Sequence, residues 1–443
     1  MSELLIQNAM VLQVGDDATI STLRAHDILI KGTRIEAIQP TGKADPSHFK
    51  QVIPANGMVA MPGLINNHAH VPMVIFRGLA EDVTIEKWFN DYMWPLERNL
   101  QPEDVYRGMM LGLVEMIEAG VTSVADHYFF MDEAAQAVEK AGTRALLGWA
   151  MFGNNGMKQI EDTAAFIQRW QGAATGRITG ILAPHSPYLC DDAFLVACVR
   201  KAEQLGVGIH THVAETMGQT EASLDKRGLT PVQVLEQTGV LSVPTILAHV
   251  CGATLPDIDL LSYYPAGVAH APKTYLKLAM GYAPVTEFRA AGIPVGLATD
   301  GAVSNNTLDL WESLRLMAMT QKERNGTPEV LTIPEALYIA TRESARVFGL
   351  PDDLGDLAPG KLADVILVDV SGVHHQPLHS IPATLVYNTR ASDVQTVICN
   401  GQVLMQDRKL KHLNKAEIIA QVNQSMSRIS QRVPSARIQV YNP

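Results

Sequence analysis

The stretch that decides the fold reads Met61-Pro62-Gly63-Leu64-Ile65-Asn66-Asn67-His68-Ala69-His70. Its apolar run at 63–66 is typical of a buried strand. The run leads directly into two histidines that are separated by one residue. Side chains two apart in a strand point to the same side. The stretch therefore predicts a strand that ends in two imidazoles directed at one point.

Seven more apolar runs of similar length follow, and longer amphipathic segments separate them. This alternation is typical of a parallel α/β barrel, in which a helix follows each strand. We therefore expect a (β/α)8 barrel of the TIM type. Its predicted strands are 63–66, 123–126, 145–150, 179–183, 207–212, 245–249, 267–270 and 295–299.

Both ends of the chain have a different texture, with short apolar strands between Asn, Asp and Gly residues. We predict strands at 4–8 and 27–32 near the N-terminus and at 363–369 and 394–399 near the C-terminus. One small β-sandwich domain is expected from both ends, with the barrel inserted between them. The predicted parts are 1–59 for the first half of the β-sandwich, 60–354 for the barrel, and 355–443 for the second half with a surface helix at about 415–430.

Bulk composition narrows the function. Hydrophobic residues make up 47% and charged residues 18% of the 443 residues, so a large core is expected. The net charge of −11 favours a small-molecule partner over nucleic acid or an anionic membrane. The four cysteines form no CxxC pair, and their scarcity fits a reducing, cytoplasmic location. We recognise neither a signal peptide nor an apolar run long enough to span a membrane.

Histidine or aspartate closes six of the eight predicted strands. Packing alone does not explain this pattern, and barrel enzymes place their active sites at the C-terminal ends of the strands. We therefore predict an active site at this rim. Its candidate residues are His68 and His70 after the first strand, His185 after the fourth, His210 and His212 on the fifth, His249 on the sixth, His270 on the seventh, and Asp300 after the eighth.

Four of these candidates form a predicted metal site, namely His68, His70, His212 and Asp300. Three imidazoles and one carboxylate suit Zn²⁺ or Fe²⁺. An open coordination position would hold water, whose pKa the metal lowers to about 7. The sequence therefore predicts hydroxide available at neutral pH.

Glu215 follows His212 by three residues, just past the predicted strand. A carboxyl group there can transfer protons beside the metal-bound water. A glutamate in the first turn of a helix is also stabilised by the helix dipole. Both interpretations of Glu215 can hold together.

Other histidines receive different interpretations. His210 shares a face with His212 and is predicted to support the metal ligands or to lie in the core, and His127 is predicted to be a packing or rim residue. His374, His375 and His379 cluster in the terminal β-domain, where a solvated loop is favoured over a metal site.

Five blocks of the sequence resemble the amidohydrolase superfamily, in its branch of heterocycle deaminases, and they occur in that family's order. The branch that the sequence resembles most is that of the methylthioadenosine/S-adenosylhomocysteine deaminases. Three segments are similar to that branch, namely Arg77-Gly78-Leu79-Ala80-Glu81-Asp82, Trp88 and Trp94-Pro95-Leu96-Glu97. The five blocks are the opening stretch 61–70, Pro184-His185-Ser186-Pro187-Tyr188, His212-Val213-Ala214-Glu215-Thr216, Ala298-Thr299-Asp300-Gly301-Ala302 with Ser304-Asn305-Asn306, and Pro359-Gly360-Lys361-Leu362-Ala363-Asp364.

The resemblance implies a role for each of these positions. The four metal candidates would bind one divalent ion, usually Zn²⁺ or Fe²⁺. Asp300 would also take the proton of the attacking water, Glu215 would protonate the ring nitrogen beside the attacked carbon, and His249 would hold and polarise the hydroxide. The predicted substrate-binding residues are Trp88, Glu97, which would accept hydrogen bonds from ribose hydroxyls, His185 and Trp149.

The chain departs from the branch around the substrate and not around the metal. Leu147-Gly148-Trp149 lacks the arginine usual after the third strand, and Val250-Cys251-Gly252 lacks a second histidine after His249. The segment from His270 to Leu278 also differs. Trp149 and Tyr275 are therefore predicted to narrow or reshape the pocket.

The predicted function is a metal-dependent hydrolytic deaminase of an adenosine-type nucleoside, 5′-methylthioadenosine or S-adenosylhomocysteine, that releases ammonia. The alternative is a deaminase or chlorohydrolase of another ring, such as cytosine, isocytosine, a pterin, an oxopurine or an s-triazine. A binuclear amide hydrolase is disfavoured because Leu182-Ala183-Pro184-His185 offers no lysine to carboxylate. A binding barrel without turnover is disfavoured by Glu215, His249 and Asp300. A homo-oligomer is compatible with the sequence.

Overall fold

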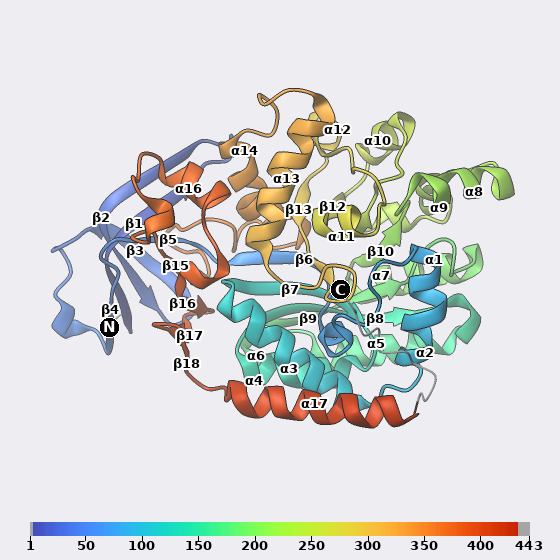
Figure 1. Ribbon diagram of the computed structural model, residues 1–443, viewed down its shortest axis with the longest axis horizontal. Coiled ribbons are helices and arrows are strands. Elements are labelled where there is room, and N and C mark those ends of the chain that lie inside the picture. The colour runs from blue at the N-terminus through green and yellow to red at the C-terminus, as the bar shows by residue number, and fades with distance from the viewer. Residues whose placement is uncertain (1–2, 433–443) are drawn as a thin grey trace.

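The computed structural model describes residues 3–432 and arranges the chain around two nine-stranded sheets (Figure 1). One sheet is parallel and forms the barrel at the centre and right of the view. The other is mixed and lies at the left, where strands from the two ends of the chain meet. The predicted fold class is confirmed.

All eight predicted barrel strands are present, and most extend a few residues beyond the predicted bounds. A ninth short strand, β14, pairs in parallel with the first barrel strand, with Asp300 opposite Ala69. Because only two residues separate β13 from β14, the sheet closes on itself. The barrel strands are β6 (Leu64–His70), β7 (Val121–Tyr128), β8 (Arg144–Met151), β9 (Ile178–Pro184), β10 (Ile209–Val213), β11 (Thr245–His249), β12 (Ala266–His270), β13 (Val295–Leu297) and β14 (Asp300–Gly301).

The barrel strands are buried on both faces because side chains fill the inside and helices cover the outside. Every residue of β7, for example, is buried, so its sequence does not alternate between apolar and polar residues. Threonine caps begin several of the covering helices, and Thr230, Thr254 and Thr332 each form a capping box with an acidic or amide side chain three residues later. The longer helices are α3 (Pro102–Glu118), α4 (Met131–Ala141), α5 (Lys158–Trp170), α7 (Asp192–Leu205), α8 (Met217–Arg227), α9 (Pro231–Gln237), α10 (Leu255–Leu261) and α13 (Leu310–Asn325).

Shorter helices complete the loops at the two ends of the barrel. The segment between β6 and α3 carries α1 (Ile85–Lys87) and α2 (Trp94–Glu97), which lie over the end of the barrel where the strands finish (Figure 1). The remaining short helices of the barrel part are α6 (Ala173–Gly176), α11 (Pro272–Lys277), α12 (Val285–Ala290), α14 (Ile333–Tyr338) and α15 (Ser344–Val347), and α16 (Ile381–Tyr387) lies between β15 and β16 of the second sheet.

The second sheet joins the two ends of the chain, as predicted. Its strands pair in the order β18-β17-β16-β15-β5-β1-β2-β3, with β4 beside β1, so the contact between the ends is the antiparallel pairing of β5 with β15. The exact domain boundaries remain predictions. The strands are β1 (Leu4–Val14), β2 (Ile20–Lys31), β3 (Arg34–Pro40), β4 (Gln51–Pro54), β5 (Met58–Pro62), β15 (Val365–Asp369), β16 (Val394–Cys399), β17 (Gln402–Gln406) and β18 (Lys409–Leu410).

A buried ion pair ties this sheet to the barrel. Arg144, at the start of β8, donates from Nη2 to Asp364 Oδ1 over 3.1 Å and from Nε to Oδ2 over 3.3 Å. Both side chains are only 3% exposed. Asp364 precedes β15 and also accepts from the backbone N–H of Asn400. The pair therefore fixes the base of the barrel to the C-terminal half of the second sheet.

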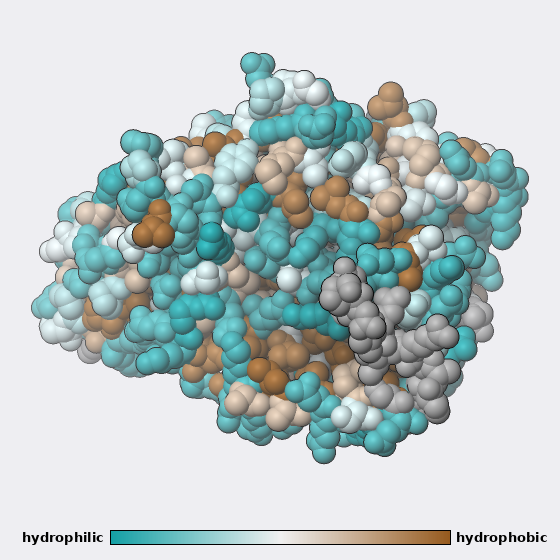
Figure 2. All heavy atoms as spheres, viewed as in Figure 1, coloured by the Kyte–Doolittle hydropathy of each residue, from teal (hydrophilic) through white to brown (hydrophobic). Residues whose placement is uncertain are grey.

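The predicted surface helix near the C-terminus is α17 (Lys415–Arg432), which runs along α3 at the bottom of the view (Figure 1). Arg107 of α3 bridges to the α17 side chains Gln424 and Ser425. The face shown in Figure 2 is mostly hydrophilic, with its apolar side chains in separate groups. Among residues 3–432, no helix combines the length and the apolar character needed to cross a bilayer.

Candidate metal and proton-transfer site

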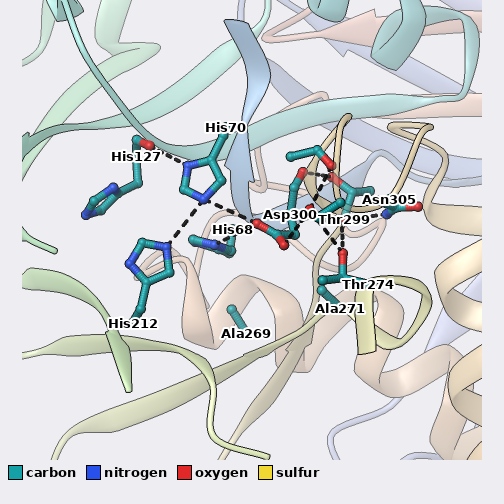
Figure 3. A network of polar contacts seen from close by, with 12 residues as sticks. His68, His70, His127, His212, Ala269, Ala271, Thr274, Thr299, Asp300 and Asn305 are labelled. Atoms are coloured by element: carbon teal, nitrogen blue, oxygen red, sulfur yellow. Dashed lines mark hydrogen bonds and ion pairs between the residues drawn. The ribbon is translucent and has the colours of Figure 1, made fainter. Parts of the chain in front are cut away.

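The predicted metal ligands meet at the C-terminal end of the barrel. His68 and His70 end β6, and the parallel register of β14 with β6 places Asp300 beside them. His212 lies on β10, across the mouth of the barrel. Asp300 Oδ1 lies 3.2 Å from His70 Nε2 and 3.4 Å from His68 Nε2. Figure 3 shows these four side chains pointing toward one another.

Backbone carbonyls orient two of these imidazoles. His70 Nδ1 donates to the carbonyl of His127 over 2.6 Å, and His212 Nδ1 donates to the carbonyl of His185 over 2.8 Å. The Nε2 atoms of His70 and His212 then face each other at 3.3 Å. Histidines that bind metals characteristically donate their second ring nitrogen to such a group. The donor set therefore fits a divalent cation between the two Nε2 atoms and Asp300.

Electrostatics at the cluster favours a positive charge. Burial works to raise the pKa of Asp300, but hydrogen bonds with His68 and His70 outweigh it and hold that pKa well below its usual range. Burial likewise works to lower the pKa of His70, but the Asp300 carboxylate raises it to about 9. Asp300 is therefore ionised, and a proton or a metal ion beside it is strongly stabilised.

A second layer of contacts supports these groups. His210 lies below His68, with its Nε2 2.9 Å from His68 Nδ1. Ser304 donates to Asp300 Oδ2 over 2.7 Å. Asp300 itself has a φ of 63°, a left-handed conformation that costs energy outside glycine and is common at functional sites. The structure thus places His210 as a support for a ligand, one of the two positions expected for it.

Glu215 and His249 lie in the same cavity as the cluster. Burial, and then the charge of Asp300, raises the pKa of Glu215 to about 7. Its Oε1 is buried and makes no hydrogen bond to any described residue. Burial lowers the pKa of His249 to about 3, so this imidazole is neutral. His249 also has a φ of 77°, so the chain is strained at this position too.

Three of the four predicted substrate-binding residues line this cavity, namely Trp88, Glu97 and His185. Glu97 accepts a hydrogen bond of 2.9 Å from the hydroxyl of Tyr128. Burial raises the pKa of Glu97 to about 7, although the Tyr128 hydroxyl opposes the shift. The rest of the wall is largely aromatic and apolar, with Phe89, Trp94, Phe129, Phe152, Leu278 and Met280.

Trp149 does not line this cavity, and its role in binding the substrate stays a prediction. Its neighbour Ala150 faces the cavity, so Trp149 points to the opposite side of β8. There it packs edge-on against Phe166 of α5, with ring centroids 6.0 Å apart. Tyr275 is also absent from the cavity wall, because its hydroxyl is buried against the backbone N–H of Ala271 at 2.8 Å.

Sequence reasoning missed three contributors. His127, predicted to be a packing or rim residue, lines the cavity and orients His70 through its carbonyl. Tyr128 holds Glu97, and Ser304 holds Asp300. Ser304 stands four residues after Asp300, in one of the five blocks that resemble the amidohydrolase superfamily. Nothing in the sequence pairs Tyr128 with Glu97.

The histidines of the terminal domain are less solvated than predicted. His374 and His375 place their Nε2 atoms 3.0 and 3.2 Å from one oxygen of Asp393, and His375 is buried. Asp393 also accepts from the backbone N–H of Arg390. His379 is exposed and takes no part. The three side chains form a hydrogen-bonded cluster far along the chain from the barrel mouth.

A (β/α)8 barrel with histidines and an aspartate gathered at the C-terminal ends of its strands defines the class of metal-dependent barrel hydrolases. A family model described as the amidohydrolase family matches residues 59–404. The chain belongs to this family.

Curated relatives confirm the branch that the sequence resembled. The chain is 42% identical to a 5-methylthioadenosine/S-adenosylhomocysteine deaminase of Pelotomaculum thermopropionicum, over 98% of this chain and 100% of the relative. It is 37% identical to a 5′-deoxyadenosine deaminase of Methanosarcina mazei, again over 98% and 100%. Among solved structures, an adenosine deaminase from Xanthomonas campestris with bound zinc matches with a TM-score of 0.92 and 29% identity, covering 97% of this chain and 99% of the other.

Proposed function

We propose that this protein is a metal-dependent hydrolase that removes the amino group of an adenosine-type nucleoside, foremost 5′-methylthioadenosine or S-adenosylhomocysteine, and releases ammonia. The observation that carries the proposal is the shared cavity. It joins a cluster that stabilises a cation to a buried carboxyl group with a pKa of about 7. The names of the relatives given above describe them as deaminases of compounds of this class.

We assign one divalent cation, with Zn²⁺ foremost and Fe²⁺ as the alternative, to His68, His70, His212 and Asp300. The facing Nε2 atoms of His70 and His212 and the ionised Asp300 support this assignment. When bound, such a cation makes hydroxide available from water near neutral pH. The solved relative from Xanthomonas campestris holds zinc.

Proton transfer is assigned to Asp300 and Glu215. Asp300 is ionised and can accept the proton that water loses on attack. Glu215, with a pKa of about 7, carries a proton in a large share of molecules at neutral pH and can donate it to the ring nitrogen beside the attacked carbon. The water oxygen bonds to that carbon, the bond between the carbon and the amino group breaks, and the amino group leaves as ammonia with the proton held by Asp300. The remaining hydroxyl proton returns to Glu215 as the carbonyl forms. We assign His249, which is neutral because of burial, to polarising the attacking oxygen.

Substrate contacts are assigned to the other side of the cavity. Glu97 accepts hydrogen bonds from the ribose hydroxyls, and Tyr128 fixes its orientation. His185 and Trp88 line the cavity beside the ring. Aromatic walls give a planar base large contact area at a small cost in side-chain entropy.

Ammonia release from a substrate panel tests the proposal. Zinc-loaded protein is given adenosine, 5′-methylthioadenosine and S-adenosylhomocysteine, and in parallel cytosine, isocytosine, guanine, a pterin and melamine. We expect release from the nucleosides. Release from the bare rings alone would overturn the nucleoside assignment and support the alternative of another N-heterocycle. The Glu215→Gln variant is the control, since it should bind metal and release little ammonia. A cytoplasmic location and a homo-oligomeric state stay predictions from the sequence.

A further inference from the structure

A second hollow meets the catalytic cavity beside Glu97. The two share the side chains of Trp94, Glu97, Phe129 and Phe152 as a common wall. Beyond this wall the second hollow is lined by more aromatic rings, among them Trp149, which does not line the catalytic cavity. We call this second hollow the aromatic annex. The annex therefore lies directly beside the catalytic cavity, with Glu97 at the boundary between the two.

One side chain gives the annex its charge. Arg98 is the only basic residue among the described residues that line it, and Arg98 is exposed. No side chain in the range 3–432 forms an ion pair or hydrogen bond with its guanidinium. The adjacent carboxyl group of Glu97 is engaged by Tyr128 instead. Because Glu97 and Arg98 are consecutive at the end of α2, one short helix supplies the wall of the catalytic cavity and the cation of the annex.

The substrates that the relatives' names give differ in the group at the 5′ position of the nucleoside. One acts on 5-methylthioadenosine and S-adenosylhomocysteine, and another acts on 5′-deoxyadenosine. In the function proposed above, Glu97 holds the ribose. The part of the nucleoside next to the ribose, its 5′ substituent, then enters the annex.

We propose that the aromatic annex binds the 5′ substituent and that Arg98 binds a carboxylate at its far end, so that S-adenosylhomocysteine is preferred over 5′-methylthioadenosine. This inference rests on the proposed function. A thioether sulfur and its methylene groups pack well against aromatic rings. A guanidinium pairs with a carboxylate through two parallel hydrogen bonds. The amino group of the same tail is a cation, which the faces of the annex aromatics attract.

The test is the ratio of kcat/KM for S-adenosylhomocysteine to kcat/KM for 5′-methylthioadenosine. In Arg98→Gln we expect this ratio to fall about tenfold, because a charged hydrogen-bonded pair is lost from a partly exposed site. Arg98→Lys should recover part of the ratio, since the charge returns without the planar fork. High salt should lower the ratio in the wild type and not in Arg98→Gln. Arg24→Gln, at an exposed arginine of the second sheet, is the matched control and should keep the wild-type ratio.

A second variant examines the apolar part of the annex. Trp149 lines the annex and not the catalytic cavity, so Trp149→Ala should lower kcat/KM for 5′-methylthioadenosine relative to that for 5′-deoxyadenosine. Turnover of 5′-deoxyadenosine by the same variant shows that it is folded. An unchanged ratio in both Arg98→Gln and Trp149→Ala would overturn the annex proposal while leaving the deaminase intact. Absence of turnover of every nucleoside by the wild type would instead overturn the proposed function.

Discussion

The Nε2 atoms of His70 and His212 lie 3.3 Å apart, although each ring donates its other nitrogen to a backbone carbonyl. Two lone pairs at this distance repel each other unless a positive charge lies between them. Asp300 adds a carboxylate oxygen 3.2 Å from His70 Nε2. A proton on His70 or a bound metal ion can supply this charge, and this makes metal content the first quantity to measure.

Substituting one cluster histidine should remove the metal. We expect His212→Asn to bind less than one tenth of the zinc bound by the wild type, because three ligands with a repositioned amide hold the ion poorly. The melting temperature of the wild type should fall on chelation, since bound metal stabilises the native state. Elemental analysis and thermal denaturation check both expectations. His374→Asn, in the terminal-domain cluster, should keep the wild-type metal content, and an equal loss there would contradict the assignment.

Glu215→Gln should separate metal binding from chemistry. An amide cannot donate a proton in the way a carboxylic acid does, so kcat should fall by about two to four orders of magnitude. KM should change little, because the amide keeps the size of the side chain. Steady-state ammonia release and zinc analysis of the same preparation provide the measurement. A variant with normal kcat would remove Glu215 from the mechanism.

Binding of the ribose should depend on pH through Glu97. Burial raises the pKa of this carboxyl to about 7, and only the ionised form offers all its lone pairs to hydroxyl donors. KM for nucleosides should therefore rise as the pH falls through about 7 and should level off above it. The Glu97→Gln variant should show a higher KM without this dependence. Measuring KM across neutral pH for both proteins decides the matter, and a parallel pH response in the variant would assign the effect to another group.

Breaking the Arg144–Asp364 pair should destabilise the whole chain. Removing one partner leaves a charge buried at a site that is 3% exposed, which costs about 3–5 kcal/mol. Asp364→Asn should therefore unfold at a lower urea concentration than the wild type, while its kcat at low temperature stays normal because the pair is remote from the cavity. Arg34→Gln is the control: it removes a surface ion pair to Asp353, for which less than about 1 kcal/mol is expected.

The barrel could be predicted because its strands are short apolar runs followed by polar residues, a pattern that survives without any knowledge of contacts. The strand ends were less accessible. β7 is buried from Val121 to Tyr128, including Asp126 and His127, and polar residues inside a buried strand give no apolar signal to extend it. β14 was missed because Asp300 and Gly301 are defined as a strand only by their pairing with β6.

The candidate metal and proton-transfer residues could be predicted together because each follows a strand at the same rim. The face of a residue was harder to assign. The bulk of Trp149 suggested that it lines the catalytic cavity. The two-residue period of a strand does not say which face is inside the barrel, and in β8 it is Ala150 that faces the catalytic cavity. Contacts between distant segments, such as Tyr128 with Glu97, arise only from the loop that carries α2 over the barrel mouth.

Closure of the barrel joins β6, the first of its strands to leave the ribosome, to β14, the last. His68 and His70 are therefore synthesised long before Asp300 can meet them, so metal capture is a late event in the life of the nascent chain. The second sheet is completed later still, because one edge of β5 has no partner strand until β15 has been translated. An exposed strand edge invites pairing with other chains. The edge of β5 is therefore open to such pairing until β15 has been translated, which is after the last of the four candidate metal ligands, Asp300, has been made.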